Sequence, residues 1–124
     1  MTTGREIALT FFGGEILLNP NEFCNLSSVV CRANDTIKSL EEKVKAATII
    51  GTIQSMADNY PGLRPQWAQN SQDERLLGVD LSGIADSPVI RNAKVLQRLK
   101  KLAIKTNQEY AEKLGINPSV AITC

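Results

Sequence analysis

A carboxylate and a thiol in the first part of the chain could perform chemistry together. Glu15 follows a glycine pair, and Cys24 comes nine residues later, just before the run Asn25-Leu26-Ser27. At this spacing the two groups can meet on neighbouring turns of one active site. The structural alternative is that Glu15 is a turn residue and that Cys24 is a packed residue of a strand.

The chain lacks histidine, and this absence narrows the chemistry further. Without imidazole, the usual zinc sites and the serine or cysteine hydrolase dyads cannot be assembled from these residues alone. Acid, base or radical chemistry would have to use carboxylates, thiols or a tyrosine. The three cysteines form no Cys-x-x-Cys pair, which favours a reducing compartment and a cytoplasmic location.

Charge and hydropathy indicate that neither nucleic acid nor a membrane is a partner. The formal net charge is +1, and the basic residues Arg98, Lys101 and Lys105 fit a solvated helix face. No apolar run approaches the ~18 residues that a membrane helix needs. With 124 residues, of which 43% are hydrophobic and 22% charged, the chain makes at most one domain of α/β type.

The elements that must position Glu15 and Cys24 are short strands. Residues 7–12 are apolar enough for a strand that ends at a glycine turn, and residues 23–30 predict a second strand with Cys24 on or beside it. Residues 119–124 predict a buried strand at the end of the chain. Between these strands the apolar spacing predicts two long amphipathic helices.

The first long helix is expected from a capping box at Ser39 and Glu42 through to Asp58. Residues 61–67 are then expected to be irregular, with Trp67 as a packing anchor; the alternative is that its ring stacks on a ligand. A helix with small residues is predicted over 76–84. The last helix is expected to open at Pro88 and to end at Gly115.

Several stretches together resemble a known enzyme family, the catalytic subunit of ribonucleotide reductase. The resemblance is carried by Glu15, Cys24, Glu74-Arg75-Leu76-Leu77-Gly78-Val79 and Gly115-Ile116-Asn117-Pro118-Ser119-Val120-Ala121-Ile122-Thr123-Cys124. It is closest to the adenosylcobalamin-dependent class and covers residues 14–124, whereas residues 1–13 diverge. At the family's Asn-Pro-Cys thiyl loop this chain has Phe11, Phe12 and Gly13.

The resemblance implies that residues 1–124 form a single partial domain, a fragment of the family's ten-stranded α/β barrel. Glu15 matches the carboxylate that takes the proton of the ribose 3′ hydroxyl, and Cys24 matches one of two reducing cysteines that serve to replace the 2′ hydroxyl. The complete enzyme would use adenosylcobalamin to convert ribonucleoside di- or triphosphates to deoxyribonucleotides for DNA synthesis. Cys31 is expected to be a small packed side chain.

Three hypotheses follow for the chain itself. It is an enzyme part that works only with flanking reductase chains, because the thiyl cysteine, the second reducing cysteine and the phosphate loop are missing. Alternatively, it is a non-catalytic module that self-associates or binds a reductase. The third alternative is a remnant without function. In all three, the isolated chain is expected to be inactive.

Overall fold

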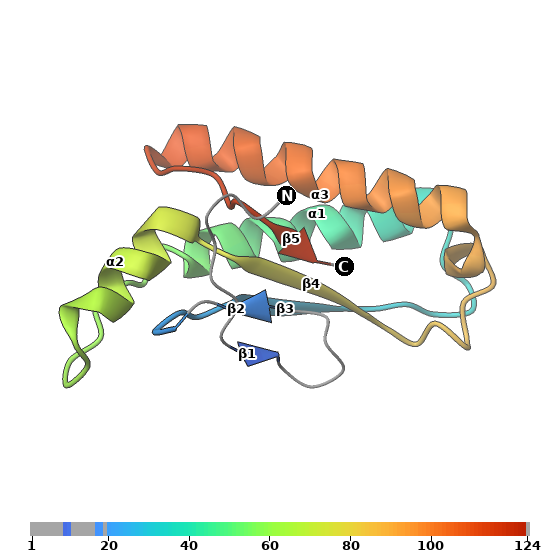
Figure 1. The fold of residues 1–124 in the computed structure, drawn as a ribbon. Helices are drawn as coiled ribbons and strands as arrows, with labels where there is room; N and C mark the ends of the chain where they lie inside the picture. Colours follow the sequence, from blue (N-terminus) through green and yellow to red (C-terminus); the bar gives the residue numbers. More distant parts are fainter. Residues whose placement is uncertain (1–8, 11–16, 19, 124) are drawn as a thin grey trace.

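The computed structural model describes residues 9–10, 17–18 and 20–123 of the chain (Figure 1). Two short strands, β1 (Leu9–Thr10) and β2 (Leu17–Leu18), pair antiparallel. The remainder is a mixed α/β unit built on a three-stranded parallel sheet. The α/β class predicted from the sequence is therefore confirmed, and so are the short strands and the two long helices.

The sheet has the order β3-β4-β5, which is also the order of its strands along the chain. Its strands are β3 (Asn25–Val30), β4 (Leu77–Ser82) and β5 (Ile122–Thr123). β3 and β4 pair over their full length, from Asn25 opposite Leu77 to Val30 opposite Ser82. β5 pairs only with the first two residues of β4.

Two long helices connect these strands and lie side by side on the same face of the sheet (Figure 1). The two long helices are α1 (Ile37–Gln54) and α3 (Ala93–Leu114). A shorter helix, α2 (Pro65–Glu74), precedes β4, and a 3₁₀ turn, η2 (Val89–Arg91), precedes α3. α1 packs against β3 and β4, and α3 packs against α1 and β5. Since the strand order advances in one direction and both crossover helices lie on one face, the two crossovers have the same hand.

The N-cap of the first long helix lies three residues before the predicted cap, Ser39. Thr36 is its N-cap, with a side chain that accepts a hydrogen bond from the backbone N–H of Ser39, and the Ser39 hydroxyl accepts from the N–H of Thr36. Ser39 therefore fills the position that the capping box assigned to Glu42. The cause is local: Thr36 is also a good cap, and its partner three residues on is a serine rather than an acid.

The helix predicted over residues 76–84 is wrong, because this segment forms β4. Arg75 ends α2 in the left-handed conformation with φ 44°, and the chain then turns into the sheet. Leu77 and Val79 are fully buried, as residues of a central strand. Hydrophobic periodicity cannot distinguish such a short apolar run from a short buried helix. The irregular stretch also ends earlier than expected, since Pro65 opens α2 and places Trp67 on a helix.

The last helix starts later than predicted but ends where expected. Pro88 precedes the short η2 turn, and α3 begins after Asn92, whose side chain accepts a hydrogen bond from the N–H of Lys94. Gly115 closes α3 with φ 70°. This left-handed terminator is the one expected from the sequence, because glycine adopts that conformation without strain.

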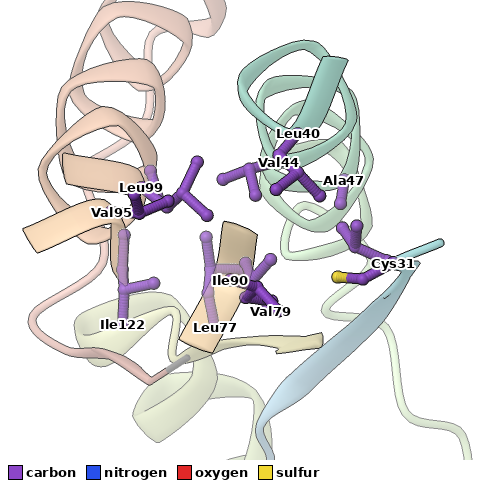
Figure 2. Packing of buried hydrophobic residues seen from close by; sticks show 12 residues of the cluster. Cys31, Leu40, Val44, Ala47, Leu77, Val79, Ile90, Val95, Leu99 and Ile122 are labelled. Atoms are coloured by element: carbon purple, nitrogen blue, oxygen red, sulfur yellow. The ribbon is translucent and has the colours of Figure 1, made fainter. Parts of the chain in front are cut away.

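One hydrophobic core lies between the two long helices and the sheet (Figure 2). Leu40 and Val44 of α1 and Leu99 of α3 meet strand residues that point toward the helices. The core members on the strands and at their ends are Val29, Cys31, Leu77, Val79 and Ile122. These positions alternate along each strand, so the intervening residues face the opposite side of the sheet.

The face of the sheet turned away from the helices is called here the open face. Its positions on β3 and β4 are Leu26, Ser28, Val30, Gly78, Asp80 and Ser82, as the pairing register and the alternation require. Leu26 is 61% exposed and Val30 is 50% exposed, whereas Val29 between them is 3% exposed. The sheet therefore has one face packed under the helices and one open face on which large apolar side chains are exposed.

Candidate functional site

Cys24 lies directly before β3 and shares its alternation with the open face. A side-chain carbon placed on Gly78 would lie 3.6 Å from Cys24 Sγ and 3.4 Å from Thr123 Oγ1. The thiol of Cys24, just before β3, and the hydroxyl of Thr123, on β5, therefore both lie close to Gly78 of the central strand β4. The prediction that Cys24 lies on or beside a strand is confirmed.

Aromatic packing fixes the chain just before this thiol. The ring of Phe23 lies 4.7 Å from that of Trp67 and 5.0 Å from that of Tyr60, measured between centroids. These tilted ring pairs join the entry to β3 with α2 and with the segment that precedes it. The contact confirms the predicted packing role of Trp67.

The surroundings of Cys24 favour the protonated thiol. Burial, and to a smaller extent the nearby negative charge of Glu22, raise the pKa of Cys24 to about 11. A thiol with this pKa is almost entirely protonated at neutral pH. Cys24 is therefore suited to donate hydrogen or a proton, and poorly suited to act as a permanent thiolate nucleophile.

The predicted partner of Cys24 lies outside the described residues. Glu15, the replaced thiyl loop at 11–13 and Cys124 all fall on positions that the structure does not describe. The pairing of Glu15 with Cys24 therefore stays a prediction. Of the two predicted site residues, Cys24 alone is placed.

Cys31 is separated from Cys24 by the sheet itself. It points into the core under the helices, is 2% exposed, and burial together with the charge of Asp35 raises its pKa. The prediction that Cys31 is a small packed side chain is confirmed. Because it is inaccessible, it offers a matched reference for any property ascribed to Cys24.

A polar cluster on the open face was not predicted from the sequence. Asp80 accepts hydrogen bonds from the hydroxyls of Ser28, at 3.1 Å, and Ser82, at 3.0 Å. The three side chains come from two strands and meet because the strands pair in parallel register. The alternation within Leu77–Ser82 was the signal that could have found them, had the segment been taken as a strand.

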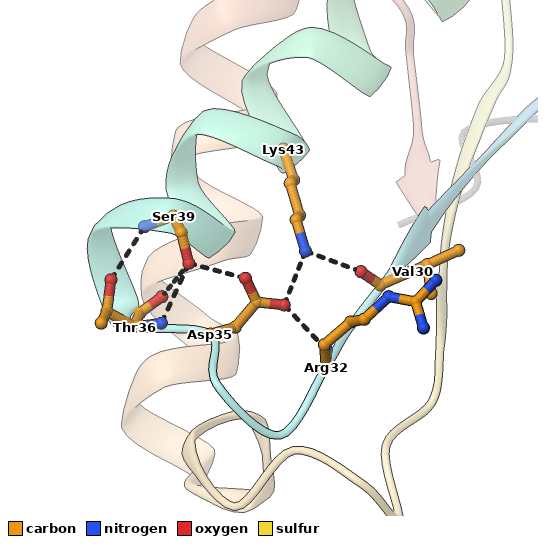
Figure 3. Close-up of polar contacts among 6 residues, drawn as sticks. All are labelled: Val30, Arg32, Asp35, Thr36, Ser39 and Lys43. Atoms are coloured by element: carbon orange, nitrogen blue, oxygen red, sulfur yellow. Dashed lines mark hydrogen bonds and ion pairs between the residues drawn. The ribbon is translucent and has the colours of Figure 1, made fainter.

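A second polar network closes the turn between β3 and α1 (Figure 3). Asp35 accepts hydrogen bonds from Lys43 Nζ at 2.6 Å, from the Ser39 hydroxyl at 2.7 Å and from the backbone N–H of Arg32 at 2.7 Å. These contacts, led by Lys43, lower the pKa of Asp35 to about 2. Lys43 Nζ also donates to the carbonyl of Val30, which ties the helix to the end of β3.

Arg75 joins three parts of the fold near the start of β4. Its guanidinium donates to the carbonyl of Ser55 at 2.6 Å and to the side chain of Asn117 at 3.1 Å. It thereby links the end of α1 to the segment that leads into β5. Although Arg75 belongs to a stretch that carries the family resemblance, its contacts within the described part of the chain are structural.

Neither a metal cluster nor a membrane span is found in the part of the chain that the structure describes. Over residues 9–10, 17–18 and 20–123, no three Cys, Asp or Glu side chains gather as metal ligands would. Within the same ranges, no helix is both long enough and apolar enough to cross a membrane.

Comparisons with known proteins add no assignment to this geometry. Models of protein families, curated proteins and solved structures were each compared with the chain, and none of the three comparisons found a match.

Proposed function

We propose that this chain is a segment of the catalytic barrel of an adenosylcobalamin-dependent ribonucleotide reductase and that it works only with the remaining segments. The observation that carries the proposal is the position of Cys24 on the open face of a parallel sheet whose crossover helices all lie behind it. In a closed α/β barrel the helices form the outer ring and the opposite face lines the interior. A sheet wound on both faces would leave no such interior.

In this proposal Cys24 is one of two reducing cysteines. Its oxidation with a second cysteine, supplied by another segment, forms a disulfide and releases two electrons and two protons. These replace the 2′ hydroxyl of the ribose by hydrogen, and the hydroxyl leaves as water. The raised pKa of Cys24 supports this role, because the reaction consumes a protonated thiol. An external dithiol then reduces the disulfide.

Glu15 is proposed as the base for the ribose 3′ hydroxyl, on the resemblance alone. A carboxylate within hydrogen-bond reach of that hydroxyl would favour removal of its proton. Residues 11–13 carry no cysteine at the thiyl position, so the proposal assigns the thiyl cysteine to another chain. The isolated protein is therefore proposed to be inactive.

Adenosylcobalamin enters this proposal on the resemblance alone. The proposal assigns the cofactor to other parts of the assembly, and the role of Cys24 involves no contact with it.

The proposal is tested by reconstitution. The purified chain is mixed with reductase segments that supply the thiyl loop, the second cysteine and the phosphate loop, together with adenosylcobalamin, a dithiol and ribonucleotides. Formation of deoxyribonucleotide only when the chain is present would support the proposal. A stable complex with the other segments that never turns over would contradict it, and so would failure to form any complex.

A further inference from the structure

Side chains from both neighbouring strands converge over Gly78, a position of β4 that has no side chain of its own. A side-chain carbon placed there would lie 2.6 Å from Cδ2 of Leu26, 3.4 Å from Oγ1 of Thr123 and 3.6 Å from Sγ of Cys24. Leu26 belongs to β3, Thr123 belongs to β5, and Cys24 directly precedes β3. The space that these three side chains surround on the open face is called here the Gly78 gap.

Strand register fixes this arrangement. Gly78 is paired with Leu26 on one side and with Thr123 on the other, so these residues form one row across the sheet. Cys24 lies two residues before Leu26 and therefore shares its face of the sheet. The thiol and the Thr123 hydroxyl thus approach the Gly78 gap from opposite sides of the central strand.

A small group in the Gly78 gap would touch the thiol and the hydroxyl together. The distances of 3.4 and 3.6 Å are ordinary van der Waals contacts, whereas 2.6 Å from Leu26 is a collision. The far end of the Leu26 side chain therefore covers the gap. This side chain is 61% exposed, so it can rotate toward solvent and admit a ligand.

We propose that Thr123 determines specificity, because its hydroxyl hydrogen-bonds a hydroxyl of the molecule that reacts at Cys24. The inference rests on the proposed role of Cys24 as a reducing cysteine. A threonine hydroxyl both donates and accepts hydrogen bonds, so it can pair with a sugar hydroxyl in either direction. Beside the thiol, it contacts the hydroxyl that leaves as water. A ribonucleotide therefore has this contact, and its deoxy product lacks it.

The test compares two reagents that differ only in hydroxyl groups, bis(2-hydroxyethyl) disulfide and diethyl disulfide, on the isolated chain. The Cys24 thiolate attacks one sulfur of the reagent and forms a mixed disulfide. The reagent's S–S bond breaks, and its other half leaves as a thiolate that takes a proton from water. Mass spectrometry of the peptides gives the rate at Cys24 for each reagent.

The ratio of the two rates isolates the effect of the hydroxyl. Both reactions need the same thiolate, so any change in the pKa of Cys24 cancels in the ratio. The ratio measured on the chain unfolded in urea gives the intrinsic preference of this thiol.

We expect the folded chain to prefer the hydroxyl reagent about fivefold more than the unfolded chain does, which is the effect of one neutral hydrogen bond. Thr123→Val keeps the branched shape without the hydroxyl and should abolish this excess. Thr123→Ser keeps the hydroxyl and should retain it. Ser28→Ala is the matched control, because the Ser28 hydroxyl also lies on the open face but donates to Asp80. It should leave the ratio unchanged.

Three results would overturn the proposal, with the fold of each variant verified by circular dichroism. The first is a folded wild-type chain without any excess over the unfolded chain. The second is an excess that persists in Thr123→Val, and the third is an excess that Ser28→Ala removes as well. Neither cofactor, nucleotide nor partner segment enters this test, so its failure is distinct from a failure of the reconstituted reductase.

Discussion

The thiol of Cys24 is held in its protonated form by two causes of unequal size. Burial is the larger, and the charge of Glu22 is the smaller. Alkylation requires the thiolate, so the rate at Cys24 should keep rising with pH up to about 11. Glu22→Gln should lower the pKa of Cys24 while leaving it above the ordinary value of 9.0, because burial remains.

Site-resolved mass spectrometry of the alkylated peptides measures this titration. Cys31 serves as the internal reference and should react only when the chain unfolds, because it is 2% exposed. A Cys24 rate that levels off near pH 8 or 9 would show that the thiol is neither desolvated nor close to a negative charge.

Asp35 makes the free energy of unfolding depend on pH between about 4 and about 2. Its pKa is lowered from 3.8 to about 2, chiefly by Lys43, so the folded state binds fewer protons than the unfolded state between these values. The stabilisation is fully present above pH 4 and is lost as the pH falls through about 2. Asp35→Asn should therefore have a lower free energy of unfolding than wild type near neutral pH. This difference between the two proteins should become smaller as the pH falls.

Urea unfolding of both proteins at several pH values measures this deficit. Asp86→Asn is the matched control, because Asp86 is exposed, and it should show no comparable trend. A deficit for Asp35→Asn that stays constant from pH 6 to about 2 would contradict the assigned network.

At the scale of the elements, the exit from β4 depends on a glycine. Gly83 has φ 81°, and a side-chain carbon there would collide with the backbone carbonyl of Cys31. Gly62 has a similar φ of 85° but has no atom within 4 Å of that position. Gly62→Ala should cost about 1 to 2 kcal/mol from the left-handed backbone alone.

Gly83→Ala adds the collision and should cost roughly 3 kcal/mol or more, since overpacking against a rigid backbone adds a further 1 to 3 kcal/mol. Chemical denaturation of the two variants separates backbone strain from the clash. Equal losses in both would show that the segments after β3 and β4 are not in close contact.

The sequence predicted those elements whose signals are local. The left-handed end of α3 at Gly115 needs only glycine after an amphipathic run. The strand beside Cys24 needs only its aromatic and β-branched residues after the turn at residues 19–21. β4 was missed because its burial comes from two neighbouring strands and two helices, which a short apolar run does not reveal. The cluster of Asp80, Ser28 and Ser82 was missed for the same reason, because its members meet only through strand register.

At the scale of the whole molecule, the three-stranded sheet has one face packed under helices and one accessible face. The core between α1, α3 and the sheet is closed, and the caps and turns around it are satisfied by local hydrogen bonds. The open face and the outer edge of β3 carry the thiol and the exposed apolar residues. The packed core and the thiol of Cys24 therefore lie on opposite sides of the same sheet.

The most direct test of the central claim compares Cys24→Ser with Cys31→Ser in the reconstituted reductase, using a dithiol as reductant. We expect Cys24→Ser to abolish turnover, by at least a hundredfold, while assembly with the other segments persists. Cys31→Ser should retain turnover once folded, because this thiol faces the core. Unchanged turnover in assembled Cys24→Ser would contradict the assignment of Cys24 as a reducing cysteine.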